Sequence, residues 1–503
     1  MRRLAAFALL CLAAAPLCAQ PVQGQTLRIG LSSDPDALDP TVSRSVAGRQ
    51  VFAALCDKLV DIDPELNLVP QLATAWRWED EERTLVLTLR PGVRFHDGSP
   101  LEATAVAASL RRHLTLAGST RRAEMGPVER VEAPGPLEVR LYLTRPFAPL
   151  LAALSDRAGM MMPVAAAALG AAEFAAKPVC AGPFRFVRRI AQDRIELERF
   201  PEYWDAARVH FDRVVYQPIP DATVRAVNLR SGSLDLIEQV QPTDIAGLRA
   251  DPRIRVVTGR SLASYYIAVN VANGVRSRGQ VGQNALVREA LELAIDRQVL
   301  TQVAFEGLYI PGNQSVPPGS PFYVASLPVP GRDLARARAL LKQAGFDRVE
   351  MQMSVPNASD YRQAAEVIQS MAAEAGIDIR LQTIEVATLL KQWTDGDFES
   401  LIIQWSGRTD VDANLYNFNA CGMALNGGHY CSKPLDAALD AARATTDMGK
   451  RMAAYEAAAQ IYLRDRPYIY LWHPVLVYGM SAKLEGFRAV PDSLMRLQGV
   501  RLP

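Results

Sequence analysis

Short apolar runs alternate with longer segments of helical periodicity along most of the chain. Segments such as 84–89 alternate polar and apolar residues, which indicates a strand with one buried face. Other segments repeat apolar residues at helical spacing, and the one over 361–375 ends at Gly376, a typical helix terminator. The predicted strands are 27–31, 84–89, 138–143, 214–216, 234–237, 264–270, 351–355 and 377–381, and the predicted helices are 44–55, 99–114, 222–230, 244–250, 287–304, 334–344 and 361–375. This mixture predicts an α/β or α+β fold.

Two stretches depart from this alternation. Residues 159–172 are apolar but contain Pro163 and lie between charged residues, so we expect a buried or interfacial helix. Residues 311–331 are rich in proline and glycine without any repeat, which predicts a long surface loop. The second half repeats the strand and helix order of the first, with no flexible linker and no tandem repeat of 20–50 residues. We therefore expect two lobes packed together.

The first twenty residues have the layout of a secretory signal peptide. Two arginines precede an apolar run over 4–17, and small residues follow around Ala19. The run is shorter than the roughly 20 residues of a membrane-crossing helix. Lipid attachment to Cys18 is not expected, because proline and leucine stand just before it. Residues 1–19 are thus predicted to be cleaved, and the mature protein to be exported to the periplasm.

Composition is that of an ordinary globular protein. The chain has 503 residues, 49% hydrophobic and 22% charged, which suits two to four domains or two large lobes. Its 55 basic and 54 acidic residues give a net charge of +1, or −1 without the first 19 residues, which hold two arginines and no acid. The basic surface of a nucleic-acid-binding protein is therefore absent. Aromatic residues gather mainly in the second half, where core packing explains them, at Tyr265, Tyr266, Trp405, Tyr416, Phe418, Tyr468, Tyr470 and Trp472.

The sequence lacks the motifs of several enzyme classes. No phosphate-binding glycine-rich loop and no Gly-x-Ser-x-Gly elbow occur, and the five histidines lie far apart without a His-x-x-x-His pair. His96 stands beside Asp97, but these residues also suit a polar connection between a strand and a turn. Asp410 and Asp412 could act as acid and base. Without a nucleophile or a metal partner, a binding role is the better interpretation, so no catalytic residue, metal or cofactor is predicted.

Several segments, taken in order, resemble one family. The chain is similar to the family 5 extracellular solute-binding proteins, the dipeptide, oligopeptide and nickel receptors of ABC importers. The likeness covers nearly all of the predicted mature chain. It is carried by Leu38-Asp39-Pro40, by TLVLTLRPGVRFHDG over 84–98, by Cys180-Ala181-Gly182-Pro183-Phe184, by 287–297 and by DLARARALLKQAGF over 333–346.

The resemblance implies a two-lobed α/β binding protein with a hinge and a ligand cleft between the lobes. The first lobe is expected over 26–262 plus 476–503, with an inserted subdomain at roughly 45–178, and the second lobe over 263–475. Ligand contacts to both lobes would favour the closed form by differential affinity.

Nine residues are expected to line that cleft. The resemblance points to Asp34, Glu238, Gln239, Tyr266, Trp405 and Trp472, although simple packing is an equal alternative for the three aromatic residues. Arg408, Asp410 and Asp412 join them because they follow Trp405 closely. In the peptide receptors of the family, the residue three after the matching tryptophan is an aspartate that pairs with the peptide's amino group. Arg408 inverts that charge, so it is expected to bind an anionic ligand group or to pair with Asp410 or Asp412.

Two disulfides are expected in an exported chain that keeps four cysteines. A Cys421–Cys431 bridge is predicted because the short intervening segment contains Gly427-Gly428 and because the family often has a bridge at this place. A Cys56–Cys180 bridge is predicted from the two cysteines that remain, both of which fall in the proposed first lobe.

The resulting hypothesis is a monomeric, non-enzymatic receptor that delivers a small polar ligand, peptide-like or anionic, to an inner-membrane ABC permease. The alternative is an exported hydrolase that acts on a peptide-like compound. A chaperone-like or sensory use of the same cleft is a third possibility.

Overall fold

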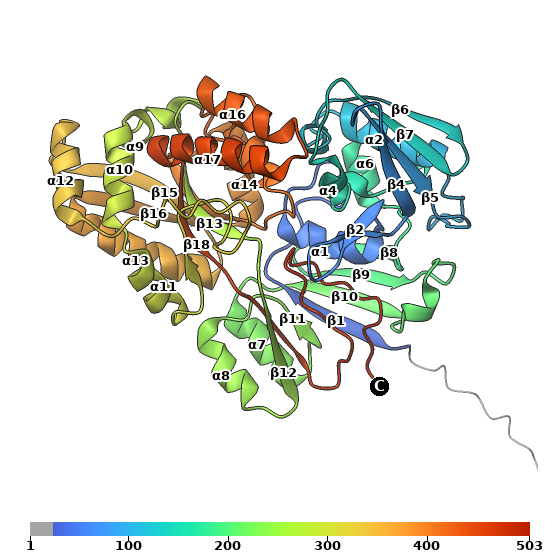
Figure 1. The fold of residues 1–503 in the computed structure, drawn as a ribbon. Coiled ribbons are helices and arrows are strands. Elements are labelled where there is room, and N and C mark those ends of the chain that lie inside the picture. The colour runs from blue at the N-terminus through green and yellow to red at the C-terminus, as the bar shows by residue number, and fades with distance from the viewer. Residues whose placement is uncertain (1–23) are drawn as a thin grey trace, which may run out of the picture.

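A computed structural model describes residues 24–503 of the chain. The signal peptide predicted over residues 1–19 lies outside the described residues. Within them, no helix is both long enough and apolar enough to cross a membrane. Figure 1 shows two lobes side by side, and the predictions of an α/β fold and of a two-lobed arrangement are both confirmed.

The first lobe is built on a seven-stranded sheet. Its central strand, β1, runs parallel to both neighbours, β10 and β11. Helix α7 (Ala222–Ser231) connects those two neighbours, as expected of the predicted βαβ-like unit, and α8 (Pro242–Arg249) precedes β12. The strand order is β12 (Ile254–Gly259), β19 (Leu476–Ser481), β11 (Leu236–Ile237), β1 (Thr26–Leu31), β10 (Arg213–Pro218), β9 (Arg194–Arg199) and β8 (Phe184–Ile190).

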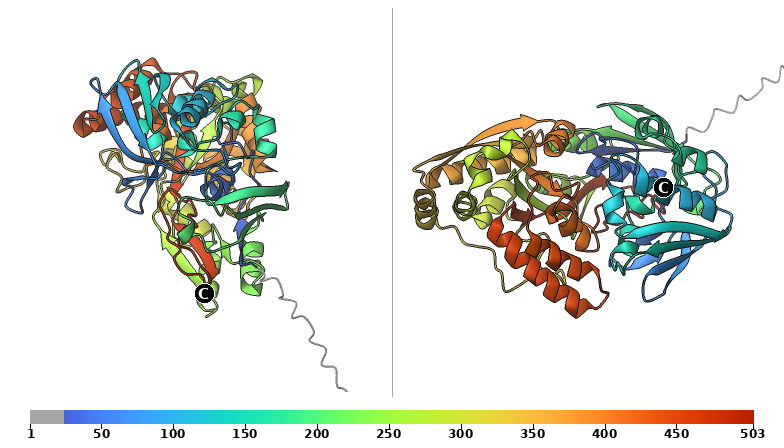
Figure 2. Two further views of the ribbon diagram at one scale, coloured as in Figure 1. Left: turned by 90° about the vertical axis from the view of Figure 1, so that its right-hand side faces the viewer. Right: turned by 90° about the horizontal axis from the view of Figure 1, so that it is seen from above.

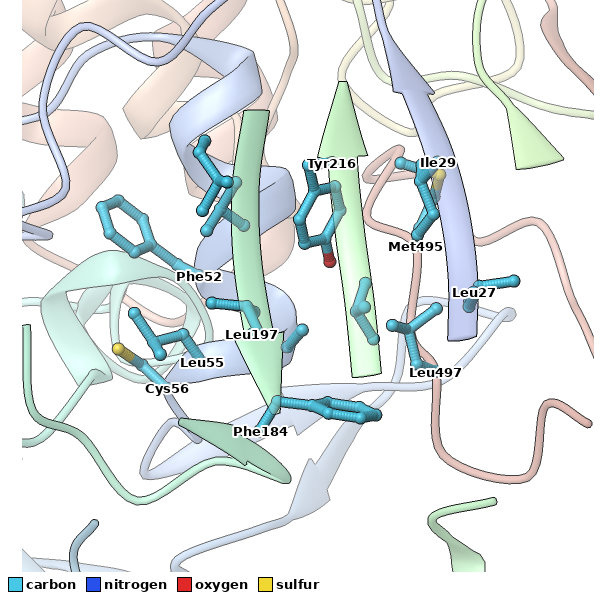
Figure 3. Packing of buried hydrophobic residues seen from close by; sticks show 14 of the residues in the cluster. Leu27, Ile29, Phe52, Leu55, Cys56, Phe184, Leu197, Tyr216, Met495 and Leu497 are labelled. Carbon is cyan, nitrogen blue, oxygen red and sulfur yellow. The ribbon is translucent and has the colours of Figure 1, made fainter. Parts of the chain in front are cut away.

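Helix α1 (Val46–Leu55) covers one face of this sheet. Ser45 caps it, because its side chain accepts a hydrogen bond from the Gly48 amide. Figure 3 shows apolar side chains of the helix and of the strands lying against one another, together with Met495 and Leu497 from the C-terminal segment. The core of the first lobe therefore combines the two ends of the chain.

A subdomain of the first lobe has a core of its own. It contains a four-stranded antiparallel sheet and a two-stranded hairpin, which lie above the seven-stranded sheet in Figure 1. The larger sheet has the order β4 (Ala73–Glu79), β5 (Thr84–Leu89), β7 (Glu138–Leu143) and β6 (Val128–Gly135), and the hairpin pairs β2 (Val60–Ile62) with β3 (Leu68–Pro70). Its helical segments are α2 (Ala103–Thr115), α3 (Arg121–Glu124), α4 (Leu150–Ala153), η1 (Arg157–Gly159), α5 (Val164–Ala167) and α6 (Ala171–Ala176).

The second lobe is built on a six-stranded mixed sheet. Its order is β14 (Ile310–Pro311), β18 (Tyr468–His473), β13 (Ser264–Val269), β17 (Ser400–Trp405), β15 (Val349–Pro356) and β16 (Ile377–Ile384). Its longer helices are α10 (Ala285–Ala294), α11 (Arg297–Phe305), α12 (Leu334–Gln343), α13 (Ser359–Ala375), α14 (Val386–Asp395), α15 (Asp412–Asn419), α16 (Lys433–Arg443) and α17 (Met448–Asp465).

Three local predictions were wrong. Residues 159–172 do not form one helix, because Pro163 and Gly170 separate the short helices η1, α5 and α6. Helix α2 begins at Ala103 rather than at Ser99, because Pro100 first forms a β-bridge with Arg94. The segment 311–331 is not all surface, since Asn313, Gln314, Ser315 and Val316 are buried.

The chain crosses between the lobes twice, at 260–263 between β12 and β13 and at 474–475 between β18 and β19. The lobes also touch away from these crossings. The Ala148 amide donates to the Arg443 carbonyl (3.1 Å), and Arg145 pairs with Asp440 (3.3 Å). Figure 2 shows α16 and α17 beside the subdomain of the first lobe. The structure therefore has its lobes closed on each other.

Candidate functional site

Two cavities lie between the lobes, on opposite faces of the second lobe's sheet. Adjacent residues of a strand point to opposite faces, so Tyr265 lines one cavity and Tyr266 the other. On the neighbouring strand β17, Gln404 pairs with Tyr265 and Ile403 pairs with Tyr266. Ile403 lines the same cavity as Tyr266, whereas Gln404 lines both cavities. The cavities have volumes of about 590 and 480 Å³ when the solvent at their open mouths is counted. They are called here the hinge cavity, lined by Tyr265, and the arginine cavity, lined by Tyr266.

The arginine cavity has a cationic wall from the first lobe and an aromatic wall from the second. The cationic wall consists of Arg44, which precedes α1, and of Arg121 and Arg157, which begin α3 and η1. No acidic residue lines this cavity among the described residues. The facing wall consists of Tyr266, Leu390, Trp393, Ile403, Gln404, Trp405, Phe418 and Leu425.

Two of these arginines are buried with unused hydrogen-bond donors. Arg121 pairs with Glu124 (2.7 Å), and Arg157 donates to the Ser43 carbonyl (2.6 Å), yet the Nε atoms of both have no hydrogen-bond partner in the described chain. The indole nitrogen of Trp393, also buried, has none either. Burial and the neighbouring Arg121 lower the pKa of Arg157 to about 9. The wall thus offers donors, which suits a ligand that accepts hydrogen bonds.

Asp156, next to Arg157 of this wall, forms ion pairs with arginines of both lobes. Arg49 of the first lobe approaches it at 3.0 Å, and Arg408 of the second lobe at 2.5 Å. Burial alone would raise the pKa of Asp156, but these arginines hold it well below its usual range. Burial and the charge of Arg49 lower the pKa of Arg408 to about 9.

The region around the arginine cavity carries an excess of positive charge. Five arginines share three carboxylates, which leaves two positive charges uncompensated, and four of the five arginines are buried. A buried cation without a counter-ion is costly, so this arrangement favours an anion at the site. The arginines are Arg44, Arg49, Arg121, Arg157 and Arg408, and the carboxylates are Asp36, Glu124 and Asp156.

The hinge cavity lies on the other face of the sheet and is lined by both crossing segments. Glu238 and Asp360, one from each lobe, supply its carboxylates. No lysine, arginine or histidine lines it among the described residues. Burial raises the pKa of Asp360 against the opposing effect of Arg225. The other polar side chains of this lining are Gln239, Gln241, Ser261, Tyr265, Tyr309, Gln404, Ser406, Tyr478 and Ser493.

Four of the nine predicted cleft residues lie in these two cavities. Glu238 and Gln239 line the hinge cavity, and Tyr266 and Trp405 line the arginine cavity. Gln239 has a φ of 50°, a left-handed conformation that costs energy for a residue with a side chain. Such strained residues cluster at binding sites.

Five predicted residues lie elsewhere. Arg408, Asp410 and Asp412 line a separate small cavity near Asp156. Asp34 pairs with Arg189 (2.7 Å). Trp472 is buried in the core of the second lobe, where it stacks on Tyr265 with ring centroids 4.8 Å apart.

The expected pairing of Arg408 with a nearby aspartate was wrong. Asp410 is bound by Arg451 (2.7 Å) and Asp412 by Arg443 (2.8 Å). With both aspartates taken, Arg408 lies over the Trp405 ring at 4.2 Å and reaches across to Asp156 in the first lobe. Its guanidinium therefore links the two lobes.

Of the charged residues that line the two cavities, only Glu238 was predicted from the sequence. Arg44, Arg121 and Arg157 belong to no motif, and only their surroundings in the fold distinguish them from the many surface arginines. Asp360 stands at a predicted helix start, where acidic residues are common. Tyr265 and Phe418 were noticed only as aromatic residues, and the alternation of Tyr265 and Tyr266 along a strand was the available signal.

Both predicted disulfides are present. Cys56 joins Cys180 and Cys421 joins Cys431, with Cα atoms 4.9 and 4.6 Å apart. Asp436 lies beside Cys421 and Cys431, but sulfurs that bind each other provide no thiolates for a metal ion.

These features define a bilobed ligand-binding protein with two crossing segments and a cleft between closed lobes. A family profile described as bacterial extracellular solute-binding proteins, family 5 Middle, matches residues 67–425. The chain belongs to this family, whose members serve ABC importers.

Similar proteins cover almost the whole chain. The glutathione-binding protein GsiB of Pectobacterium atrosepticum is 27% identical over 487 residues, which span 94% of this chain and 93% of GsiB. The structure of the A. tumefaciens R10 binding protein AgaA with agropinic acid is 26% identical with a TM-score of 0.87, covering 95% of this chain and 99% of AgaA. The Helicobacter pylori protein DppA with the peptide STSA is 25% identical with a TM-score of 0.88, covering 95% of this chain and 98% of DppA.

Proposed function

We propose that this protein is the periplasmic receptor of an ABC importer and that it binds a small ligand through a carboxylate or other anionic group in the arginine cavity. The observation that carries the proposal is the set of three arginines that face an aromatic wall across the cleft. Guanidinium groups bind carboxylates and phosphates in two-pronged contacts, and aromatic rings supply apolar contact. The ligand then bridges the lobes and favours their closed arrangement.

The relatives support an anionic ligand. GsiB is described as glutathione-binding, and AgaA was solved with agropinic acid. Glutathione carries two carboxylates, and agropinic acid is an acid by name. A receptor of this group that binds such a ligand needs a cationic subsite, and Arg44, Arg121 and Arg157 provide one.

A binding role without catalysis is part of the proposal. The lining of the two cavities contains no histidine or cysteine among the described residues. The serines of the hinge cavity therefore have no imidazole base, which removes the main support for the hydrolase alternative. Cleavage of residues 1–19, monomeric action in the periplasm and delivery to an inner-membrane permease complete the proposed function.

Titration calorimetry with glutathione and other small acids tests the proposal. We expect Arg157→Gln to weaken binding about 10- to 100-fold, because it removes a charge-assisted contact. Arg208→Gln, at an exposed position paired with Asp205, serves as the matched control and should leave binding unchanged. Absence of binding to every small acid, or equal affinity of both variants, would contradict the proposal. A recovered ligand that the purified protein has cleaved would favour the hydrolase.

A further inference from the structure

We propose that the ligand presents two negative charges, and no ammonium group, to the arginine cavity. This inference rests on the proposed function and narrows it to a class of ligand: a dicarboxylate or a phosphate monoester that carries an apolar body. A free amino acid or peptide, whose ammonium group needs an acidic partner, is not expected there.

The surrounding ion pairs leave the positive charge of the arginine cavity in place. Four further carboxylates of the surrounding structure have basic partners of their own at 2.5 to 2.8 Å: Asp410 with Arg451, Asp412 with Arg443, and Asp61 and Asp492 with Lys58 and Arg496. Glu238 and Asp360, which form no ion pair within the described chain, line the hinge cavity. The two uncompensated positive charges described above therefore remain, and a ligand with two negative charges neutralises them.

The uncompensated charge lies beside unused hydrogen-bond donors. Arg121 and Arg157 are each 1% exposed, and the Nε atoms of both, like the indole nitrogen of Trp393, have no hydrogen-bond partner in residues 24–503. Burial lowers the pKa of both arginines, and the charge of Arg121 lowers that of Arg157 further. One group with two negative charges stabilises two guanidinium groups that repel each other and accepts their hydrogen bonds.

An ammonium group has no acidic partner in this cavity. No aspartate or glutamate lines it within the described chain. The acids beside the cationic wall are already held, Glu124 by Arg121 at 2.7 Å, and Asp156 by Arg49 and Arg408 at 3.0 and 2.5 Å. An ammonium group would have to displace an arginine from one of these ion pairs, and the three arginines of the wall would repel it.

The facing wall suits an apolar body rather than a chain of amides. Four of its eight residues have no polar side-chain atom: Leu390, Ile403, Phe418 and Leu425. The indole nitrogen of Trp405 is already used, because it donates to Asn414 (2.7 Å). Amide groups of a peptide placed against this wall would lose hydrogen bonds with water and gain few in return. A hydrocarbon or a ring loses none.

Calorimetry with a matched set of phenyl acids, titrated into the full chain at pH 8, tests the inference. Phenylsuccinate carries two carboxylates, its monoamide carries one, and 3-phenylaspartate carries two carboxylates and an added ammonium group. Phenyl phosphate represents the monoesters and is close to doubly charged, because the second pKa of such a phosphate is about 6. We expect phenylsuccinate or phenyl phosphate to bind at least about ten times more tightly than the monoamide and than 3-phenylaspartate. The tighter of the two dianions identifies the kind of acid.

A variant of the cationic wall tests the origin of this preference. Arg157→Gln lowers the excess charge from two to one, so it should reduce the preference for the dianion over the monoamide to about threefold or less. Arg208→Gln, exposed and paired with Asp205, is the control and should leave the preference unchanged. If Arg157→Gln does not fold, Arg44→Gln, at a half-buried position, takes its place with the same expectation. An unchanged preference in the folded variant overturns the inference.

The outcomes separate the two proposals. If the monoamide or 3-phenylaspartate binds as tightly as the dianions, the inference of a doubly charged ligand is wrong and the anion receptor stands. The same conclusion follows if glutathione binds and neither dianion does. If no acid binds in any form, both proposals fail.

Discussion

At the scale of single residues, Asp57 illustrates a carboxyl kept in an unusual state. It is buried and accepts hydrogen bonds from Gln71 (3.0 Å), Tyr203 (3.0 Å) and Trp204 (2.7 Å), all neutral donors. Burial raises its pKa to about 7, although the bonds from Trp204 and Tyr203 oppose the rise. The folded protein therefore binds a proton here that the unfolded chain releases near pH 4, as ordinary aspartates do at about that pH.

This linkage predicts a stability that falls with pH. Because the folded pKa lies above the unfolded value, the contribution is complete below the unfolded pKa and is lost as the pH rises through about 7. As the pH rises from about 5 to about 8, loss of the Asp57 contribution should lower the free energy of unfolding by roughly 2–3 kcal/mol. Urea denaturation at both values measures it, and Asp57→Asn should reduce the difference. The same slope in wild type and variant would show that other groups cause it.

Some residues that line the cleft could be predicted from the sequence, and others could not. Tyr266 and Trp405 were found because the family resemblance places aromatic residues of the cleft at both positions. Arg121 and Arg157 were not found, because the contacts that make their charge unusual come from distant segments. Arg408 was noticed for its charge, but its true partner, Asp156, belongs to the other lobe. Whether an arginine has a counter-ion depends on contacts between segments that are distant in the sequence.

At the scale of elements, the loop after β17 depends on a glycine. Gly407 has a φ of 76°, and a Cβ atom there would lie 2.1 Å from the Leu262 carbonyl oxygen in the first crossing segment. The loop that carries Ser406 and Arg408 can therefore approach the hinge only without a side chain at this position.

Gly407→Ala should destabilise the protein more than a glycine substitution in open space. Gly92 has the same φ of 76°, but a Cβ atom added there would meet nothing within 4 Å, so Gly92→Ala isolates the conformational cost. We expect about 1 kcal/mol for Gly92→Ala and at least about 2 kcal/mol more for Gly407→Ala, because its Cβ overlaps the backbone. Chemical denaturation of the two variants decides this, and equal losses would contradict the close approach.

The two disulfides close loops of very different length. Cys56 and Cys180 are 124 positions apart and tie the end of α1 to the start of β8, whereas Cys421 and Cys431 are 10 apart. If constraint of the unfolded chain dominates, the longer loop stabilises more by about 2 kcal/mol. Paired cysteine-to-serine variants of each bridge, compared by denaturation without reductant, measure the difference. A larger loss for the Cys421–Cys431 pair would show that native packing outweighs chain entropy.

The elements with clear periodicity were predictable, but none was predicted beyond residue 381, where α14 to α17 and β17 to β19 lie. Strands such as β5 and helices such as α13 have clear periodicity, and Gly376 ends α13 in a left-handed conformation as expected. The helix predictions for 159–172 and 99–103 were wrong, because proline and local hydrogen bonds outweighed the apolar pattern. The buried start of segment 311–331 could not be predicted, because the side-chain amides of Asn313 and Gln314 donate to backbone carbonyls further along the loop, those of Leu327 and Val324.

At the scale of the whole molecule, the closed arrangement depends on polar links between the lobes. Arg408 joins Asp156 at 2.5 Å, and Arg49 donates to the Ser406 hydroxyl at 2.9 Å. Both links break when the lobes separate, so they contribute only to the closed state.

Arg408→Gln should therefore shift the protein toward an open state. Asp156 keeps Arg49 as a partner, so we expect a loss of about 1–3 kcal/mol in closure and a weaker affinity for any ligand that requires closed lobes. Small-angle scattering without ligand should give a larger radius of gyration than wild type, while Arg276→Gln, at an exposed pair inside the second lobe, should not. An unchanged radius together with reduced affinity would instead indicate direct contact of Arg408 with the ligand.

The return of the chain into the first lobe has a consequence for biogenesis. Strand β19 stands between β12 and β11 inside the seven-stranded sheet, and Gln50 binds the backbone of Ser493 and Met495. Synthesis starts at the N-terminus, so β1 and β10 are made long before β19, the last strand of their sheet. The second lobe, whose strands all lie between 264 and 473, can assemble earlier. The seven-stranded sheet of the first lobe is thus completed only after the last residues have been made, whereas the subdomain, which has a core of its own, does not need them.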